Sequence, residues 1–149
     1  MDPRLKIIHD STSFTKRPPI SFKVIEYIEN YVNENLLTEK KIIVNGNWEV
    51  HLVLAFCEES ARYKSDYIFL AKTPTTVTKE KTKIYEMLIP MKMLKNASNP
   101  YLKTIELICE AVKIFLTTTY KKISPAEMDA FWGKMDVKYL LSLPYPAPV

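Results

Sequence analysis

Residues 42–57, IIVNGNWEVHLVLAFC, decide the fold that the sequence predicts. Asn45 and Gly46 both tolerate positive φ, which a tight type I′ turn requires, so we expect two strands to fold back here. Beyond the turn, every second residue is large and apolar, and these residues share one face of a strand: Trp48, Val50, Leu52, Leu54 and Phe56. We therefore interpret the stretch as the central hairpin of an antiparallel sheet, with a register that the buried face specifies.

Three further segments have the pattern of strands. Residues 66–71 and 82–89 are predicted strands, the first with Tyr67 and Phe69 on one face and Ile68 and Leu70 on the other. Residues 72–81 form a long hairpin loop between them, and Pro90 cannot continue a ladder. Residues 5–9 are short and apolar. Because the connections are short, the sequence predicts an antiparallel meander of about four strands, with residues 5–9 counted as a fifth if they join it.

Helical patterns flank the strands on both sides. Ser21 is a suitable N-cap for a helix that runs to about Asn35, with apolar residues at helical spacing and an acidic outer face. Asn99, followed by Pro100, predicts the start of the longest helix, which we expect to continue to Lys122.

Two shorter helices are predicted near the C-terminus. Residues 124–127, Ser-Pro-Ala-Glu, form a capping box that begins one helix, and Gly133 is a suitable C′ residue to end it. Asp136 can cap a last helix that ends before Pro144. The sequence thus predicts a single α+β domain over residues 1–149, in which the meander packs against an N-terminal helix and two to three C-terminal helices.

Composition excludes several functional classes. The chain has 149 residues and a net charge of +4, which suits one domain and is less basic than a dedicated nucleic-acid binder. Only two glycines occur, so glycine-rich phosphate-binding loops are excluded. Cys57 and Cys109 lie far apart and form no Cys-x-x-Cys motif, so we expect buried free thiols and no metal or other cofactor.

The N-terminal residues and the overall hydropathy pattern predict where the protein acts. Met1 and the residues after it are polar and form no apolar signal segment. No apolar run approaches the length of about 20 residues that spans a bilayer. We therefore expect a cytoplasmic protein that does not contact membranes.

Candidate catalytic residues are few. The two histidines are His9 and His51, and no Gly-x-Ser-x-Gly nucleophile elbow is present. A small hydrolase-like enzyme using His51 with Glu49 or Glu58 is the third hypothesis for function, and the chain is predicted not to be an enzyme. A nucleic-acid-binding accessory protein ranks second because lysines cluster around the long hairpin, at Lys79, Lys81, Lys83, Lys92 and Lys95.

Binding to another protein is the first hypothesis. Acidic pairs can complement a basic partner, and a partly exposed tryptophan can anchor an interface. The residues predicted to contact a partner are Glu26, Glu29, Glu58, Glu59, Arg62, Tyr63 and Trp132.

The size, the sheet followed by C-terminal helices, and residues 128–141, MDAFWGKMDVKYLL, resemble the immunity proteins of bacterial polymorphic-toxin and contact-dependent growth inhibition systems. The resemblance implies a protein that binds one cognate toxin domain tightly and blocks its active site or an essential surface. Immunity proteins against nucleases are often acidic, and the charge of +4 departs from that tendency. We therefore expect either a locally acidic contact surface or a toxin that is not strongly basic.

Overall fold

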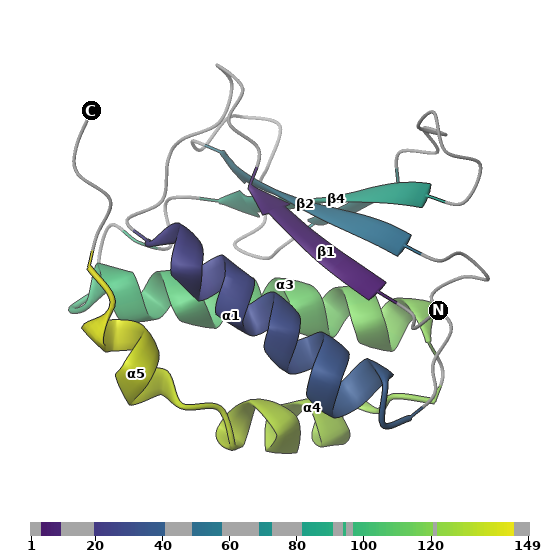
Figure 1. Ribbon diagram of the computed structural model, residues 1–149. Coiled ribbons are helices and arrows are strands. Elements are labelled where there is room, and N and C mark those ends of the chain that lie inside the picture. Colours follow the sequence, from purple (N-terminus) through teal and green to yellow (C-terminus); the bar gives the residue numbers. More distant parts are fainter. Residues whose placement is uncertain are drawn as a thin grey trace.

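The computed structural model describes residues 4–9, 20–40, 49–57, 69–72, 82–90, 94, 97–120 and 122–144. The elements, in chain order, are β1 (Arg4–His9), α1 (Phe22–Val32), the π-helix η1 (Asn33–Leu37), β2 (Glu49–Cys57), β3 (Phe69–Lys72), β4 (Thr82–Pro90), α3 (Pro100–Thr119), α4 (Pro125–Gly133) and α5 (Val137–Ser142). Helices α1 and α3 lie across one face of the sheet, and α4 and α5 lie on the other side of these two helices (Figure 1).

The sheet corrects the predicted topology. Its strand order is β1-β2-β4-β3. β1, β2 and β4 are parallel, and only β3 runs antiparallel, beside β4. The fold is α+β as predicted, but the antiparallel meander is wrong. The predicted turn at Asn45 and Gly46 lies outside the described residues, and β2 begins at Glu49.

Two features of the chain explain the parallel strands. Helix α1 stands between β1 and β2, so these strands form a β-α-β unit, in which a crossover helix returns the chain in the same direction. After β2 the chain first forms β3, at the far edge of the sheet. It then turns back into β4, which lies between β2 and β3 and therefore runs antiparallel to β3 and parallel to β2. The sequence predicted that β3 and β4 form an antiparallel pair, and this part is confirmed.

The core lies between the sheet and its two helices. The alternation predicted for β2 is confirmed where it is described, because Val50, Leu52, Leu54 and Phe56 are fully buried. Leu52 is in register with Tyr85 on β4, and the Tyr85 ring lies 5.1 Å from that of Phe115 on α3. This face of the sheet therefore faces the helices.

Helix α3 begins and packs much as predicted. The Asn99 side chain accepts a hydrogen bond from the Leu102 N–H, and Pro100 occupies the first turn. The helix ends at Thr119, slightly before the predicted Lys122.

Helix α1 begins after its predicted cap, Ser21, whose hydroxyl accepts from the Lys23 N–H. It passes at Asn33 into η1, where the Thr38 N–H donates to the Asn33 carbonyl at 3.0 Å. A π-helical turn is wider than an α-helical turn and admits one more residue. Leu36 and Leu37 are both buried as a result.

Helices α4 and α5 have the predicted start signals. Ser124 accepts from the Glu127 N–H, and the Glu127 carboxylate accepts from the Ser124 N–H, so the capping box is confirmed. Gly133 is the last helical residue of α4, and the C-cap is Lys134 in a right-handed conformation, so the predicted C′ role of the glycine is wrong. Asp136 caps α5 as predicted.

Candidate functional site

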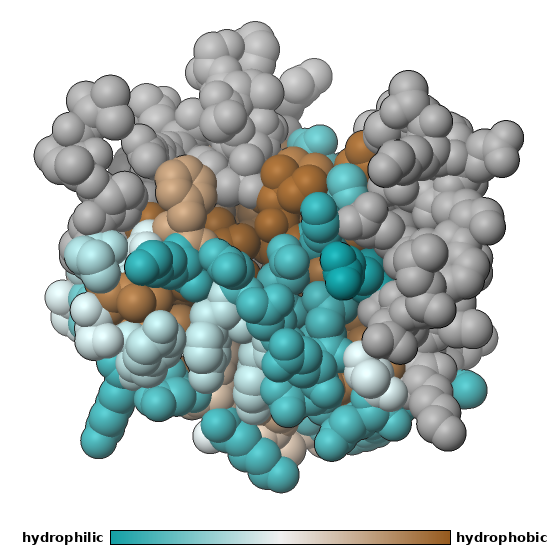
Figure 2. Space-filling view, in the orientation of Figure 1, coloured by the Kyte–Doolittle hydropathy of each residue, from teal (hydrophilic) through white to brown (hydrophobic). Residues whose placement is uncertain are grey.

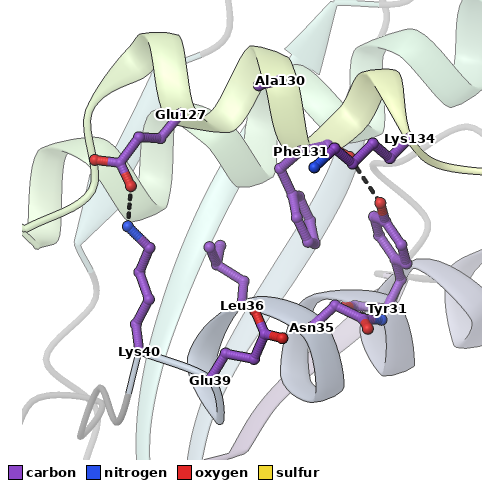
Figure 3. A pocket seen from close by; sticks show the side chains of 9 residues that line it. All are labelled: Tyr31, Asn35, Leu36, Glu39, Lys40, Glu127, Ala130, Phe131 and Lys134. Atoms are coloured by element: carbon purple, nitrogen blue, oxygen red, sulfur yellow. Dashed lines mark hydrogen bonds and ion pairs between the residues drawn. The ribbon is translucent and has the colours of Figure 1, made fainter.

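A groove lies between α4 and the end of α1 with η1 (Figure 3). Its volume is about 530 Å³ and it is open to solvent. Residues from both sides line it: Tyr31, Asn35, Leu36, Glu39, Lys40, Glu127, Ala130, Phe131 and Lys134. We refer to it as the α1–α4 groove.

The floor of the α1–α4 groove is aromatic. The rings of Tyr31 and Phe131 stack with their centroids 4.3 Å apart. The Tyr31 hydroxyl donates to the Phe131 carbonyl at 2.7 Å. Burial, with a smaller contribution from Tyr27, raises the pKa of Tyr31 above its ordinary value, so the phenol keeps its proton at neutral pH. Leu36 and Phe131 extend into the space between the two helical segments (Figure 3).

The rim of the groove carries charge. Lys40, just after η1, forms an ion pair with Glu127 of α4 across one end of the groove. Glu127 therefore has two roles, since its carboxylate also completes the capping box of α4. Glu39 and Lys134 are exposed, and neither has an ion pair within the described part of the chain. These two groups are available to pair with charges on another molecule.

The groove continues into a row of neighbouring aromatic rings, some stacked and some tilted or edge-on, which we name the aromatic strip: Tyr139, Tyr27, Tyr31, Phe131 and Trp132. Neighbouring ring centroids along the strip are 5.4, 6.3, 4.3 and 5.1 Å apart. Tyr139 belongs to α5, Tyr27 and Tyr31 to α1, and Phe131 and Trp132 to α4, so the strip connects α1 with two helices that are far from it in the chain. Tyr139 is 47% exposed, and the other four rings are partly buried.

The aromatic strip differs from the surface around it. Figure 2 shows mainly hydrophilic residues over the outward face of α1. Tyrosine and tryptophan have a large apolar ring with a polar end, and both are enriched where one protein binds another. A row of such rings beside a charged groove is therefore suited to recognising a protein surface.

Three of the seven residues predicted to contact a partner, Glu26, Glu29 and Trp132, lie in the described part of the chain. Glu26 is exposed on α1, whereas the Glu29 carboxylate is half-buried and accepts from the Ile7 N–H of β1 at 2.9 Å. Trp132 is part of the aromatic strip, and its indole Nε1–H is buried without a hydrogen-bond acceptor. The other four, Glu58, Glu59, Arg62 and Tyr63, lie outside the described residues.

Neither His51, a candidate for catalysis, nor the thiol of Cys109 lines the α1–α4 groove. His51 lies mid-strand on β2, half-buried, in register with Lys6 and Ile84 on the neighbouring strands. Cys109 on α3 is buried, and burial raises the pKa of its thiol to about 12, with smaller contributions from Glu106 and Glu110. This thiol stays protonated at neutral pH and is a poor nucleophile.

The remaining candidates lie partly outside the described residues. The side chains of Glu49, Cys57 and Lys83 are not described, and Lys79, Lys81, Lys92, Lys95 and Glu58 lie in segments that are not described at all. In the described part of the chain, no three His, Cys, Asp or Glu side chains are placed to share a metal ion. No helix there has the length and apolar character needed to cross a membrane.

Several residues of the site were not identified from the sequence: Tyr27, Tyr31, Lys40, Glu127 and Phe131. One signal was available for two of them. Tyr27 and Tyr31 are four residues apart, so they share a helix face, and that face lies beside the apolar stripe of α1. A pair of tyrosines at the margin of a buried stripe indicates where a second helix packs.

Known proteins provide no further constraint on the site. Comparison of the chain with protein families, with curated proteins and with solved structures finds no significant match.

Proposed function

We propose that this chain is a non-catalytic binding protein, an immunity protein that neutralises a cognate bacterial toxin domain, and that it binds the toxin through the aromatic strip and the α1–α4 groove. The observation that carries the proposal is the strip of five neighbouring aromatic rings, which crosses three helices. Two of its rings, Tyr31 and Phe131, line the groove beside Glu39 and Lys134, whose charges have no ion pair in the described part of the chain. The resemblance of residues 128–141 to immunity proteins supports the same class of partner, because that segment covers most of α4 and α5.

The proposed mechanism is steric and electrostatic occlusion. Aromatic side chains have few rotatable bonds, and those of the strip are already in contact with neighbouring rings, so little conformational entropy is lost when a partner covers them. Glu39 and Lys134 then pair with opposite charges on the toxin and fix its orientation. The protein would act in the cytoplasm, where a toxin that had entered or been made in the cell would have to be blocked.

The test is calorimetry with the toxin domain encoded beside this gene. We expect a one-to-one complex, and we expect Tyr139→Ala and Phe131→Ala each to weaken it about tenfold or more, as is typical of aromatic anchors. Glu86→Gln is the matched control, because Glu86 lies on β4 in register with Val53, on the sheet face opposite the helices. Absence of a complex, or equal losses for all three variants, would contradict the proposal.

A further inference from the structure

The outer edge of β1 is covered by one side chain of α1 and one of η1. β1 is the end strand of the sheet, with β2 as its neighbour on the inner side. An end strand presents backbone N–H and C=O groups that can pair with a strand of another chain. In this protein Leu5 and Ile7 direct such groups away from β2 and toward α1.

Asn33 engages both backbone groups of one β1 residue. Its Oδ1 accepts from the Leu5 N–H at 2.8 Å, and its Nδ2 donates to the Leu5 carbonyl at 2.7 Å. In an antiparallel ladder, a hydrogen-bonded pair of residues exchanges two bonds in the same way. The side-chain amide of Asn33 therefore occupies the place of one residue of an antiparallel strand.

Glu29 extends the same arrangement along β1. Its Oε2 accepts from the Ile7 N–H at 2.9 Å, the next outward-facing donor on the strand. The Asn33 Nδ2 also donates to the Glu29 backbone carbonyl at 3.0 Å, which fixes the orientation of the amide. Glu29 on α1 and Asn33 at the start of η1 are four residues apart in the chain, and Ile28 and Val32 beside them are fully buried. The core thus holds both groups at the edge of the strand.

We propose that Glu29 and Asn33 form an edge latch, which prevents β1 from pairing with β1 of a second copy of this chain. Two identical edges related by a two-fold axis pair antiparallel, and the Leu5 N–H and C=O that Asn33 occupies are the groups such a pairing needs. Ile8 is 38% exposed on this strand and would add apolar contact in a dimer. This role does not depend on the proposed function, because neither Glu29 nor Asn33 lines the α1–α4 groove or belongs to the aromatic strip.

Amide hydrogen exchange by NMR tests each half of the latch separately. We expect Asn33→Ala to speed exchange of the Leu5 amide about five- to tenfold, as for the loss of a hydrogen bond of ordinary strength. Glu29→Ala should do the same for the Ile7 amide, whereas Glu29→Gln keeps an acceptor and should change it less. Asn30→Ala is the matched control, since Asn30 is an exposed asparagine on the same helix.

Sedimentation velocity tests the consequence for assembly. The wild-type chain and Asn30→Ala should stay monomeric from micromolar to near-millimolar concentration, while Asn33→Ala should form dimers as its concentration rises. If Asn33→Ala does not fold, Glu29→Ala provides the same two measurements at Ile7. An unchanged exchange rate at Leu5, a folded Asn33→Ala that stays monomeric throughout, or a wild-type dimer through β1 would each overturn the proposal.

Discussion

Helices α3 and α4 lie against each other and are held in place by different forces. Ten of the twenty residues of α3 are buried, whereas Met128 is the one buried residue among the nine of α4. Burying a large apolar side chain contributes about 1.5–3 kcal/mol, so the core alone fixes the position of α3. Helix α4 lacks that support and depends on contacts made at its surface.

The contacts of α4 reach in two directions. Asp129 pairs with Lys113 of α3 at 2.9 Å, and Glu127 pairs with Lys40 beside η1. The third contact is the hydrogen bond from Tyr31 to the carbonyl of Phe131. Each interaction of this kind contributes about 1 kcal/mol or less to stability. Substitutions at the surface of α4 should therefore cost the fold less than substitutions in the buried face of α3.

The largest expected effect comes from the core of α3. Phe115 is fully buried, and its ring lies against the rings of Tyr85 and Tyr120. We expect Phe115→Ala to lower the free energy of unfolding by about 3–5 kcal/mol, because the lost ring leaves a cavity. Urea denaturation followed by circular dichroism measures this. A loss below about 1 kcal/mol would show that α3 is not the helix that the core fixes.

The same contrast explains which elements the sequence predicted well. Asn99 with Pro100 marked the start of α3, and the capping box at Ser124 marked the start of α4, because these signals act within one turn of chain. Alternation in β2 correctly predicted its buried face, because the side-chain period of a strand is two residues. The predicted neighbours of β2 were wrong, because alternation indicates which face of a strand is buried and does not indicate which strands pair with it. The apolar run over residues 52–56 was the available signal, since a strand covered on both faces is typical of parallel sheets.

The candidate site was harder to predict than the fold. Its two closest links join residues far apart in the chain: Lys40 to Glu127, separated by 87 residues, and Tyr31 to Phe131, separated by 100. Periodicity and spacing report on neighbours within one element and carry no information on such pairs. Glu29 was predicted to contact a partner because it lies on the polar face of its helix. In the structure its carboxylate accepts a hydrogen bond from the backbone of β1, a contact that helical periodicity does not indicate.

An intermediate effect is expected when matched caps are removed from the two helices. Ser124→Ala and Asn99→Ala each delete a side chain that accepts an N–H in the first turn, at a cost of about 1 kcal/mol. Amide hydrogen exchange should then differ between the two helices. Ser124→Ala should speed exchange throughout α4, whereas Asn99→Ala should affect only the first turn of α3, whose interior is held by buried residues. Equal effects along both helices would remove the distinction between them.

The smallest expected effect concerns the ion pair between α3 and α4. The hydrogen bond from Lys113 to Asp129 raises the pKa of Lys113 above its ordinary value of 10.5. Burial lowers this pKa by a smaller amount, and the charges of Glu110 and Asp129 raise it further. A group whose pKa is raised by folding stabilises the fold below its unfolded pKa and loses that contribution as the pH rises through its folded pKa. We therefore expect Lys113→Met to cost at most about 1 kcal/mol at neutral pH, and the difference from wild type to vanish well above pH 10.5.

Lys103→Met is the control for this ion pair, because Lys103 pairs at 3.8 Å with Glu106 within α3 itself. That pair joins no second helix, so its removal should leave exchange in α4 unchanged, whereas Lys113→Met should speed it. Thermal melts and hydrogen exchange at low and high salt provide both measurements, since salt screens an exposed pair. If the two lysine variants behave alike, the Lys113–Asp129 pair does not hold α4, and its position must depend on Met128 and the aromatic strip instead.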